Sequence, residues 1–262
     1  MKNLTKWLKY IQLIKNWPIC FIYYINYHLN NDFIILFMRN GIKLKIKKTK
    51  EDKSGLSAFN DVWVRDYYRR RKFKIADSDI VVDIGANTGM FSIYASRHAR
   101  FGKIFAFEPF KENIKILKEN LKLNGIKNVY PFECAVSDRI GYKTLFVSRD
   151  NLCHSFHMKQ KIKNKVKVKT INLSRIFKEN KIKKIDFLKM DCEGAEYEIL
   201  LGCSKKDLDK IKKICLEYHN LSEKFNCFSL IKFLKYQGFD VSSEKISKDN
   251  GYEYGYIYAT RD

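Results

Sequence analysis

Two acidic side chains enclose a glycine-containing turn in this chain. Asp83 and Gly85 come directly after a short apolar run at residues 80–82, and Gly89 lies four residues after Gly85. Glu108 ends a second apolar run, about twenty residues beyond the glycines. An acidic residue at this distance is where nucleotide-binding α/β folds hold the hydroxyl groups of a ribose. The types and spacing of these residues therefore predict a nucleotide-cofactor site.

The order of residues within the turn distinguishes between two cofactors. Dinucleotide folds use Gly-x-Gly-x-x-Gly, because the pyrophosphate must approach the N-terminus of the following helix. Here Asn87 stands between the glycines, Met90 follows them, and the carboxylate of Asp83 would repel a pyrophosphate. That carboxylate suits the cationic amino-acid end of S-adenosylmethionine, directly or through water. The turn favours S-adenosylmethionine over NAD, and a turn without a ligand is the remaining alternative.

A strand, a helix and a second strand are needed to position the turn. The β-branched run at residues 80–82 is typical of a buried parallel strand. Apolar residues at helical spacing follow over residues 91–95, with Gly102 expected to end the helix, and residues 104–107 predict the second strand. Together they form a βαβ unit.

Strands and helices continue to alternate beyond this unit. This alternation predicts an α/β fold with a doubly wound, mostly parallel, seven-stranded sheet covered by helices on both faces. Two extra strands, at residues 142–147 and 166–171, frame a polar loop that contains His154 and His157. The remaining predicted strands are residues 129–135, 185–190, 211–218, 239–241 and 254–260, and the predicted helices are residues 60–71, 111–124, 172–180 and 225–237, with one more ending at residue 201.

Residues 1–58 are predicted to form an N-terminal helix and hairpin extension, and residues 59–262 the cofactor-binding domain. Residues 1–30 are amphipathic, with Trp7 and Trp17 among lysines. Their densest apolar run is too short to cross a bilayer, and no small-residue cleavage site follows it. Two interpretations stay open: a helix packed on the catalytic domain, which is favoured, or an interfacial helix in peripheral contact with a membrane.

A hairpin is predicted after this segment. Asn40-Gly41 is a strong turn signal between two apolar runs within residues 33–47. The second run alternates between apolar and polar residues, which predicts one wet face. A polar link over residues 47–57 is expected to lead to the first helix of the catalytic domain.

Composition narrows the class of protein. With 45% hydrophobic residues the chain is not globally disordered, and its seven cysteines occur singly, which argues against a disulfide framework or a zinc site. This cysteine usage predicts a reduced, cytoplasmic protein. The net charge of +22 suits nucleic acid, an anionic membrane surface or phosphorylated substrates. The excess is almost all lysine spread along the chain, so a uniformly lysine-coated surface is an equal alternative.

Several separated motifs resemble the FkbM family of S-adenosylmethionine-dependent methyltransferases. They are VDIGANTG at residues 82–89, FEP at 107–109, AVSD at 135–138, DFLKMDCEGAE at 186–196 and EYH at 217–219. The resemblance covers residues 33–262 and implies a class I, Rossmann-like methyltransferase fold and O-methylation. Family members often carry acidic residues where this chain has Leu173-Ser174-Arg175. The residues expected to contact the cofactor are Asp83, Gly85, Ala86, Asn87, Thr88, Gly89, Glu108, Pro109, Val136, Ser137 and Asp138.

Three side chains are candidates for the base that removes the acceptor proton: Asp191, Glu193 and His219. Each follows or ends a predicted strand, where ligands of open α/β sheets bind. Each also has a structural alternative: a helix cap for Asp191, a local salt bridge for Glu193 and a core histidine for His219. The sequence does not demand a metal ion.

The predicted reaction is methylation of a hydroxyl, with a sugar of a surface glycan or its precursor as the first acceptor class. RNA and natural products are the alternatives, and a non-catalytic protein that retained the fold is another. The fourth strand ends in Asp-Cys-Glu-Gly, whereas enzymes that methylate base amino groups use an Asn/Asp-Pro-Pro-aromatic block. No nucleic-acid partner is therefore expected, and the sequence does not predict the oligomeric state.

Overall fold

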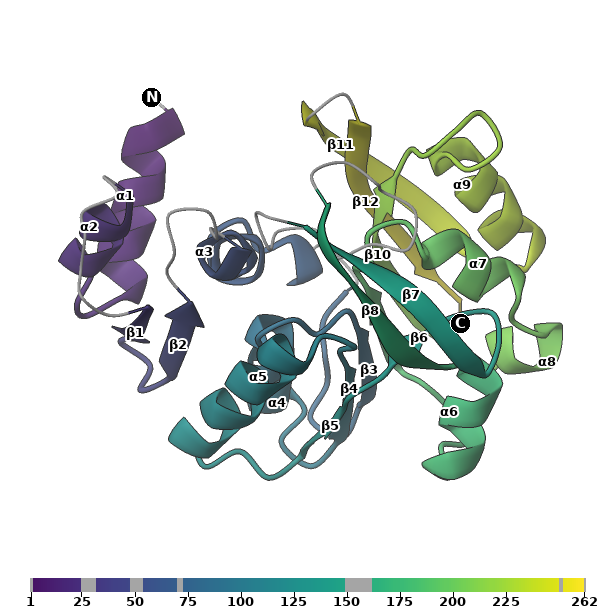
Figure 1. Ribbon diagram of the computed structural model, residues 1–262, viewed down its shortest axis with the longest axis horizontal. Helices are drawn as coiled ribbons and strands as arrows, with labels where there is room; N and C mark the ends of the chain where they lie inside the picture. The colour runs from purple at the N-terminus through teal and green to yellow at the C-terminus, as the bar shows by residue number, and fades with distance from the viewer. Residues whose placement is uncertain are drawn as a thin grey trace.

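A computed structural model describes residues 2–24, 32–47, 54–69, 73–148, 162–249 and 252–261. Within these ranges the main sheet has seven strands in the order β11-β12-β10-β9-β3-β4-β5 (Figure 1). The five strands from β10 to β5 are parallel, β12 is antiparallel to β10, and β11 is antiparallel to β12. The strands are β3 (Ile80–Ile84), β4 (Lys103–Phe107), β5 (Val129–Phe132), β9 (Phe187–Met190), β10 (Lys213–His219), β11 (Asp240–Asp249) and β12 (Tyr252–Thr260).

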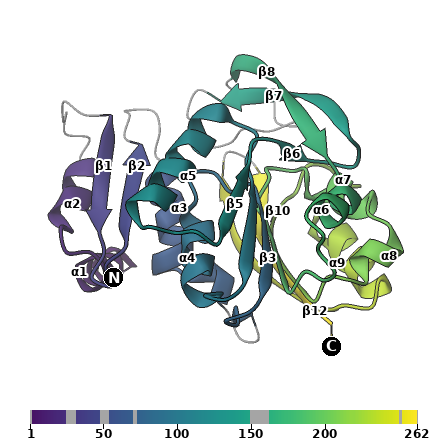
Figure 2. The same ribbon diagram turned by 90° about the horizontal axis from the view of Figure 1, so that it is seen from below.

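Helices cover both faces of this sheet, as predicted (Figures 1 and 2). Successive side chains of a strand point to opposite faces. Val81 accordingly packs in one core cluster with residues of α4 and α5, whereas Val82 packs in another with residues of α6, α7 and α9. The prediction of a doubly wound α/β fold is confirmed. The helices are α4 (Met90–His98), α5 (Lys111–Leu123), α6 (Leu173–Glu179), α7 (Glu196–Leu201), α8 (Lys205–Leu208) and α9 (Cys227–Tyr236).

The predicted third strand, residues 129–135, is divided in the structure. β5 ends at Phe132, and the chain then turns so that β6 (Ala135–Val136) pairs with β8 (Ile162–Ile171) instead. β8 also pairs with β7 (Gly141–Ser148), and the three strands form a separate sheet. Sequence periodicity missed the division because both halves are apolar. The loop with His154 and His157 lies outside the described residues.

The helix predicted over residues 60–71 begins earlier and is interrupted. α3 (Ser54–Phe59) continues as a π-helix, η1 (Asn60–Val64), and a 3₁₀ turn, η2 (Tyr67–Arg69), follows. Asp66 lies between them with a positive φ of 58°, which breaks the helical path. The predicted polar link was therefore wrong at residues 54–57. Smaller differences are that α4 ends at His98 rather than at Gly102, and that β11 is longer than the predicted strand at 239–241.

The N-terminal extension consists of α1 (Lys2–Leu13), α2 (Pro18–Tyr24) and the predicted hairpin, β1 (Phe33–Phe37) with β2 (Lys43–Lys47). The Tyr10 hydroxyl donates a 2.6 Å hydrogen bond to Asn60 Oδ1, and Trp7 and Trp17 pack against the same core cluster as α4. The described residues thus follow the favoured interpretation, a segment packed on the catalytic domain. The division into residues 1–58 and 59–262 stays a prediction. No described helix is long and apolar enough to cross a membrane.

One buried asparagine connects the extension to the glycine turn. Asn120 of α5 is fully buried, and its Oδ1 accepts a hydrogen bond from the Lys45 backbone N–H at 2.6 Å. Its Nδ2 lies 3.1 Å from the Lys45 carbonyl oxygen and 3.0 Å from the Thr88 carbonyl oxygen. The hairpin, α5 and the turn are therefore joined by a single side chain.

Candidate active site

The glycine turn after β3 touches the backbone that follows β9. The N–H groups of Gly85 and Ala86 both donate to the Phe107 carbonyl, each at 3.0 Å, which anchors the turn to β4. Gly85 has a φ of +75°, and a Cβ atom at this position would lie 1.8 Å from the Asp191 carbonyl oxygen. Only glycine fits there, because both the backbone conformation and the close approach exclude a side chain.

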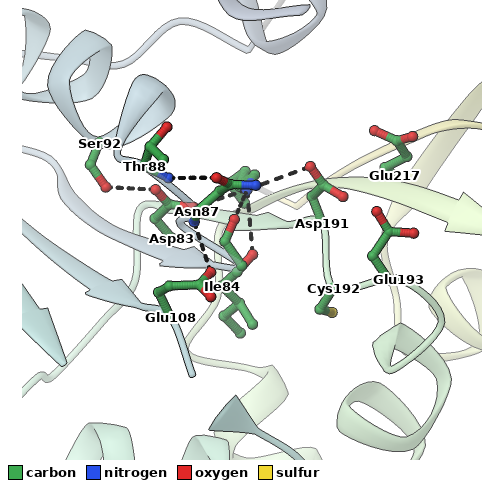
Figure 3. Close-up of polar contacts among 12 residues, drawn as sticks. Asp83, Ile84, Asn87, Thr88, Ser92, Glu108, Asp191, Cys192, Glu193 and Glu217 are labelled. Carbon is green, nitrogen blue, oxygen red and sulfur yellow. Dashed lines mark hydrogen bonds and ion pairs between the residues drawn. The ribbon is translucent and has the colours of Figure 1, made fainter. Parts of the chain in front are cut away.

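The Asp83 carboxylate lies beneath this turn and is fully buried (Figure 3). Ser92 donates a 2.6 Å hydrogen bond to its Oδ2, and Lys189 Nζ lies 3.1 Å from its Oδ1. Lys189 is itself 3% exposed and donates to the Gly85 carbonyl at 2.7 Å. Burial alone would lower the pKa of Lys189, but Asp83 and Asp191 raise it above its usual value, so the ammonium group stays charged. The pair holds the turn in place, while contact between Asp83 and the cofactor stays a prediction.

Glu108 lies at the end of β4, as the spacing predicts, and it is 5% exposed. The Asn87 N–H donates to its Oε2 and the Phe110 N–H to its Oε1, both at 2.9 Å. Burial raises the pKa of Glu108 to about 7, although these hydrogen bonds act in the opposite direction. Asn87 takes a positive φ of 49°, which directs its N–H toward this carboxylate. Glu108 and Asn87 therefore form one polar unit beside the turn.

The remaining predicted cofactor residues differ in their surroundings. Ala86 and Val136 are buried apolar side chains, and Pro109 is partly exposed. The Ser137 hydroxyl lies 2.8 Å from Asp138 Oδ1 and 2.9 Å from Glu198 Oε1.

A small ion-pair network holds Asp138. Lys143 Nζ lies 3.1 Å from Asp138 and 2.6 Å from Glu198. Partial burial acts to raise the pKa of Asp138, but the hydrogen bonds from Ser137 and Lys143 lower it to about 2. Asp138 is therefore a carboxylate at neutral pH.

A group of carboxylates surrounds His219 at the end of β10. His219 Nε2 lies 3.3 Å from Glu193 Oε2 and 3.9 Å from Glu217 Oε1, and its Nδ1 lies 3.7 Å from Glu196 Oε1. Burial would lower the pKa of His219, yet these three carboxylates raise it well above its usual value. The three carboxylates therefore favour the imidazolium form of His219, whose charge compensates theirs.

The pKa values of Asp191 and Glu217 are raised as well, which in a carboxyl group disfavours the charged form. Burial raises the pKa of each carboxyl group; the charges of Glu196 and Asp83 add to this effect at Asp191, and the charge of Asp191 adds to it at Glu217. The Asp191 side chain still keeps 31% of its surface exposed. The Tyr256 hydroxyl donates a 2.7 Å hydrogen bond to Glu217 Oε2. The structure thus brings Asp191, Glu193 and His219 together, as expected, and adds Glu217.

Four residues at the site were not predicted: Lys189, Glu217, Tyr256 and Asp61. A signal was present for Glu217, which lies two residues before His219 on the same strand and so on the same face.

Asp61 is on the π-helix η1 and pairs with Arg65 at 2.9 Å. Burial raises the pKa of Asp61 to about 6, and the Asp191 charge adds to this effect. No local pattern marks Asp61, because its place follows from how η1 packs on the sheet. In the described ranges no three His, Cys, Asp or Glu side chains are arranged to hold a metal ion.

A comparison with known families decides the class. Residues 83–254 match the family model described as the methyltransferase FkbM domain. The chain belongs to this family. The resemblance seen in the motifs is confirmed, and the chain is an S-adenosylmethionine-dependent methyltransferase with a class I fold.

Relatives and solved structures are similar to this FkbM-family chain to different extents. The 31-O-demethyl-FK506 methyltransferase FkbM of Streptomyces tacrolimicus is 23% identical over 233 residues, which cover 78% of this chain and 88% of that protein. The hexuronic acid methyltransferase AglP of Haloferax volcanii is 26% identical over 143 residues, which cover 55% of this chain and 57% of that protein. The crystal structure of Trm5b from Pyrococcus abyssi superposes with a TM-score of 0.50 at 19% identity. The superposition covers 88% of this chain and 56% of the Trm5b chain, and it shows that the two share a fold.

The residues of the turn fit the methyl donor of this FkbM-family enzyme. S-adenosylmethionine supplies an electrophilic methyl group on a sulfonium. Glu108 offers acceptor oxygens for two ribose hydroxyls, although each of its oxygens already accepts one backbone N–H. Thr88 Oγ1 is buried and has no hydrogen-bond partner among the described residues, so it has capacity for a ligand. Ser137 and Asp138 directly follow β6 and are the expected partners for the adenine.

Proposed function

We propose that this enzyme methylates a hydroxyl of a sugar, in a glycan or a glycan precursor. The observation that carries the proposal is a group of charges beside the glycine turn. The Asp191 carbonyl approaches Gly85, the Asp191 charge raises the pKa of Glu217, and His219 Nε2 lies 3.9 Å from Glu217 Oε1. Carboxylates accept hydrogen bonds from hydroxyl groups, and a polyhydroxylated acceptor offers several donors at once. The same group disfavours an acceptor with a negative charge at the reacting position, because its own carboxylates already repel one another.

The residues have distinct roles in this proposal. Methyl transfer from a sulfonium is an in-line displacement, so alignment of the acceptor oxygen contributes much of the rate. Asp191 accepts the hydroxyl proton, since it is the carboxylate with an exposed surface and a raised pKa. Glu217, held by Tyr256, accepts a hydrogen bond from a neighbouring hydroxyl. His219 stays protonated and holds Glu193 and Glu217 in position, and is not the base.

Two relatives support different acceptors. The name of the Haloferax volcanii protein gives a hexuronic acid as its substrate, which favours a sugar acceptor here. The name of the Streptomyces tacrolimicus protein gives a demethylated FK506, and its match covers 78% of this chain. Natural-product O-methylation is therefore the second candidate.

We further propose a cytoplasmic enzyme that touches the inner face of the membrane through residues 1–30. Trp7 and Trp17 are packed against the core cluster, so lipid contact falls to other side chains. Leu8, Ile11 and Phe21 are exposed apolar residues on α1 and α2, and lysines lie beside them in sequence. Basic segments of this kind are attracted to anionic lipid.

The test is transfer of a labelled methyl group from S-adenosylmethionine into fractionated extract of the source cell. The expected result is base-stable label in the glycan or lipid-linked glycan fraction, and its absence with the Asp191→Asn variant. Label mainly in RNA would contradict the proposal, and label in small apolar molecules would favour the natural-product alternative.

A further inference from the structure

The outer face of the β7–β8 strand pair carries a row of lysines opposite aromatic residues. Lys165, Lys167 and Lys169 alternate along β8 with valines that face a small core cluster, and all three are exposed. We call these three residues the lysine row. In the antiparallel register, Phe146 is opposite Lys165 and Tyr142 is opposite Lys169, so both rings share the face of the lysine row.

Two of the three lysines lie over aromatic rings. Lys167 Nζ lies 4.9 Å from the centre of the Tyr142 ring, and Lys165 Nζ lies 5.5 Å from the centre of the Phe146 ring. In the described part of the chain, Lys165, Lys167 and Lys169 form no ion pair with an acidic side chain. Residues two apart on one strand lie about 6.6 Å apart. The lysine row is therefore a set of cations at regular backbone spacing, two of which, Lys165 and Lys167, lie over ring faces rather than beside carboxylates.

The lysine row starts beside the cofactor residues. β8 ends at Ile171, whose carbonyl accepts a hydrogen bond from the Ser137 N–H at 2.8 Å, and β6 pairs with β8 at Thr170 and Ile171. β6 begins three residues after β5 ends, at the carboxyl edge of the main sheet. Figure 2 shows β6, β7 and β8 together across this edge. Lys169, the near end of the lysine row, is thus two residues from the strand end that bonds Ser137, so a chain-like acceptor that leaves the edge along β8 would meet the lysine row.

We propose that the lysine row binds the carboxylate or phosphate groups of an acidic glycan chain whose neighbouring, uncharged position is methylated. The inference rests on the proposed sugar acceptor and names its chemical class. The protein has two regions of opposite charge. The carboxylates of Asp191 and Glu217 disfavour an anion at the reacting position, whereas the lysine row attracts an anion away from that position. Acidic groups of the chain then bind outside the active site.

The same geometry disfavours single-stranded RNA as the occupant. Nucleic acid that binds exposed aromatic residues does so by stacking bases on free ring faces. Here the faces of Tyr142 and Phe146 are already approached by ammonium groups, so a base would have to displace a lysine. A polyanion that meets the lysines by charge and hydrogen bonds needs no such displacement.

The test compares two triple variants of the full chain with equal loss of charge. Lys165→Gln/Lys167→Gln/Lys169→Gln removes the lysine row, and Lys115→Gln/Lys118→Gln/Lys122→Gln removes three exposed lysines from α5. Binding is measured by calorimetry without cofactor, using oligogalacturonate, an oligo(glycerol phosphate) of equal charge, fully methyl-esterified oligogalacturonate and oligouridylate. The two charged glycans distinguish carboxylate from phosphate. Binding of S-adenosylmethionine and circular dichroism confirm that each variant is folded.

The expected result is that loss of the lysine row weakens binding of at least one charged glycan about tenfold and reduces its salt dependence, while the α5 variant changes little. The esterified glycan should not bind. Equal losses in both variants would show that net charge alone attracts the glycan, and tighter binding of oligouridylate would assign the lysine row to RNA; either result overturns the proposal. Methyl transfer to a neutral sugar, measured separately, tests the proposed function without the lysine row.

Discussion

Lys189 lies 3.1 Å from Asp83, and both side chains are almost completely buried beneath the glycine turn. They come from β9 and β3, which are neighbours in the sheet although about a hundred residues separate them in sequence. Because Lys189 also donates to the Gly85 carbonyl, the pair couples the stability of the sheet to the shape of the cofactor site.

Replacement of one partner of this pair should destabilise the protein strongly. Asp83→Asn leaves the buried ammonium of Lys189 without this carboxylate, and Lys189→Met leaves the buried carboxylate of Asp83 without its ammonium partner. Either variant should lower the free energy of unfolding by roughly 3–5 kcal/mol. Replacement of both, Asp83→Leu with Lys189→Met, should recover part of the loss. Urea unfolding measures each value, with Lys205→Met of an exposed surface pair as the control. Single variants as stable as the parent would show that the pair does not hold the turn.

Glu108 should make both stability and cofactor affinity depend on pH. Its pKa of about 7 in the fold exceeds the usual value of about 4.3 in an unfolded chain. The folded state therefore holds the proton more tightly, and the stability from this residue is complete below about pH 4.3 and is lost as the pH rises through 7. The loss amounts to roughly 4 kcal/mol. The parent should thus lose stability over this range relative to Glu108→Gln, as followed by urea unfolding.

Cofactor affinity should change in the opposite direction. Ionised Glu108 is the better acceptor for ribose hydroxyls, so the affinity for S-adenosylmethionine should rise between pH 6 and 8. Calorimetry of the parent and of Glu108→Gln tests this effect. A pH dependence that persists unchanged in the variant would assign it to another group.

Substitutions in the carboxylate group should separate catalysis from binding. Asp191→Asn should lower turnover about a hundredfold or more, because it removes the acceptor of the hydroxyl proton, while the dissociation constant of the cofactor changes little. Glu217→Gln should raise the KM of the acceptor more than it lowers kcat. Exposed Glu223→Gln is the isosteric control. If Asp191→Asn retained full turnover and only unfolded earlier on heating, its role would be structural.

Gly85→Ala should reduce stability and cofactor binding far more than Gly238→Ala. Both glycines have a positive φ, of 75° and 89°, so alanine costs about 1–2 kcal/mol in backbone energy at either position. At Gly85 the new Cβ atom would also meet the Asp191 carbonyl oxygen, whereas nothing lies within 4 Å at Gly238. Gly85→Ala should therefore lose cofactor binding or fail to fold, and Gly238→Ala should show only the smaller loss. Similar thermal midpoints for the two variants would contradict the close approach.

The exposed apolar residues of α1 and α2 should mediate any membrane contact. Leu8→Ser/Ile11→Ser/Phe21→Ser should abolish co-sedimentation with phosphatidylglycerol vesicles, and binding by the parent should weaken with added salt. The control is Phe101→Ser/Phe228→Ser/Tyr236→Ser, which removes three highly exposed rings elsewhere. Absence of sedimentation by the parent would leave the extension with its packing role alone.

Local sequence patterns determined the parts of the site that one βαβ unit contains. The turn at Gly85 and the distance to Glu108 could be predicted, since strand, turn and helix follow each other directly. The motifs also indicated Asp191 and His219, because each comes at the end of a strand. The packing of residues 1–24 stayed open, because the amphipathic pattern suits either protein or lipid, and the contact of Tyr10 with Asn60 is not a local feature.

Only the tertiary structure decided which charges meet. In the sheet, β9 lies between β3 and β10, although β4 and β5 come between β3 and β9 in sequence. This strand order brings Lys189 to Asp83 and Asp191 to the glycine turn. Asp61, Asp191 and Glu217 come from three separate segments, and the pKa values of these carboxyl groups rise because the segments pack together. The pairing of Ala135 in β6 with Thr170 in β8 is likewise a contact between segments far apart in the chain. Periodicity reports which face of a strand is buried, but strand order and register depend on side chains far apart in the chain.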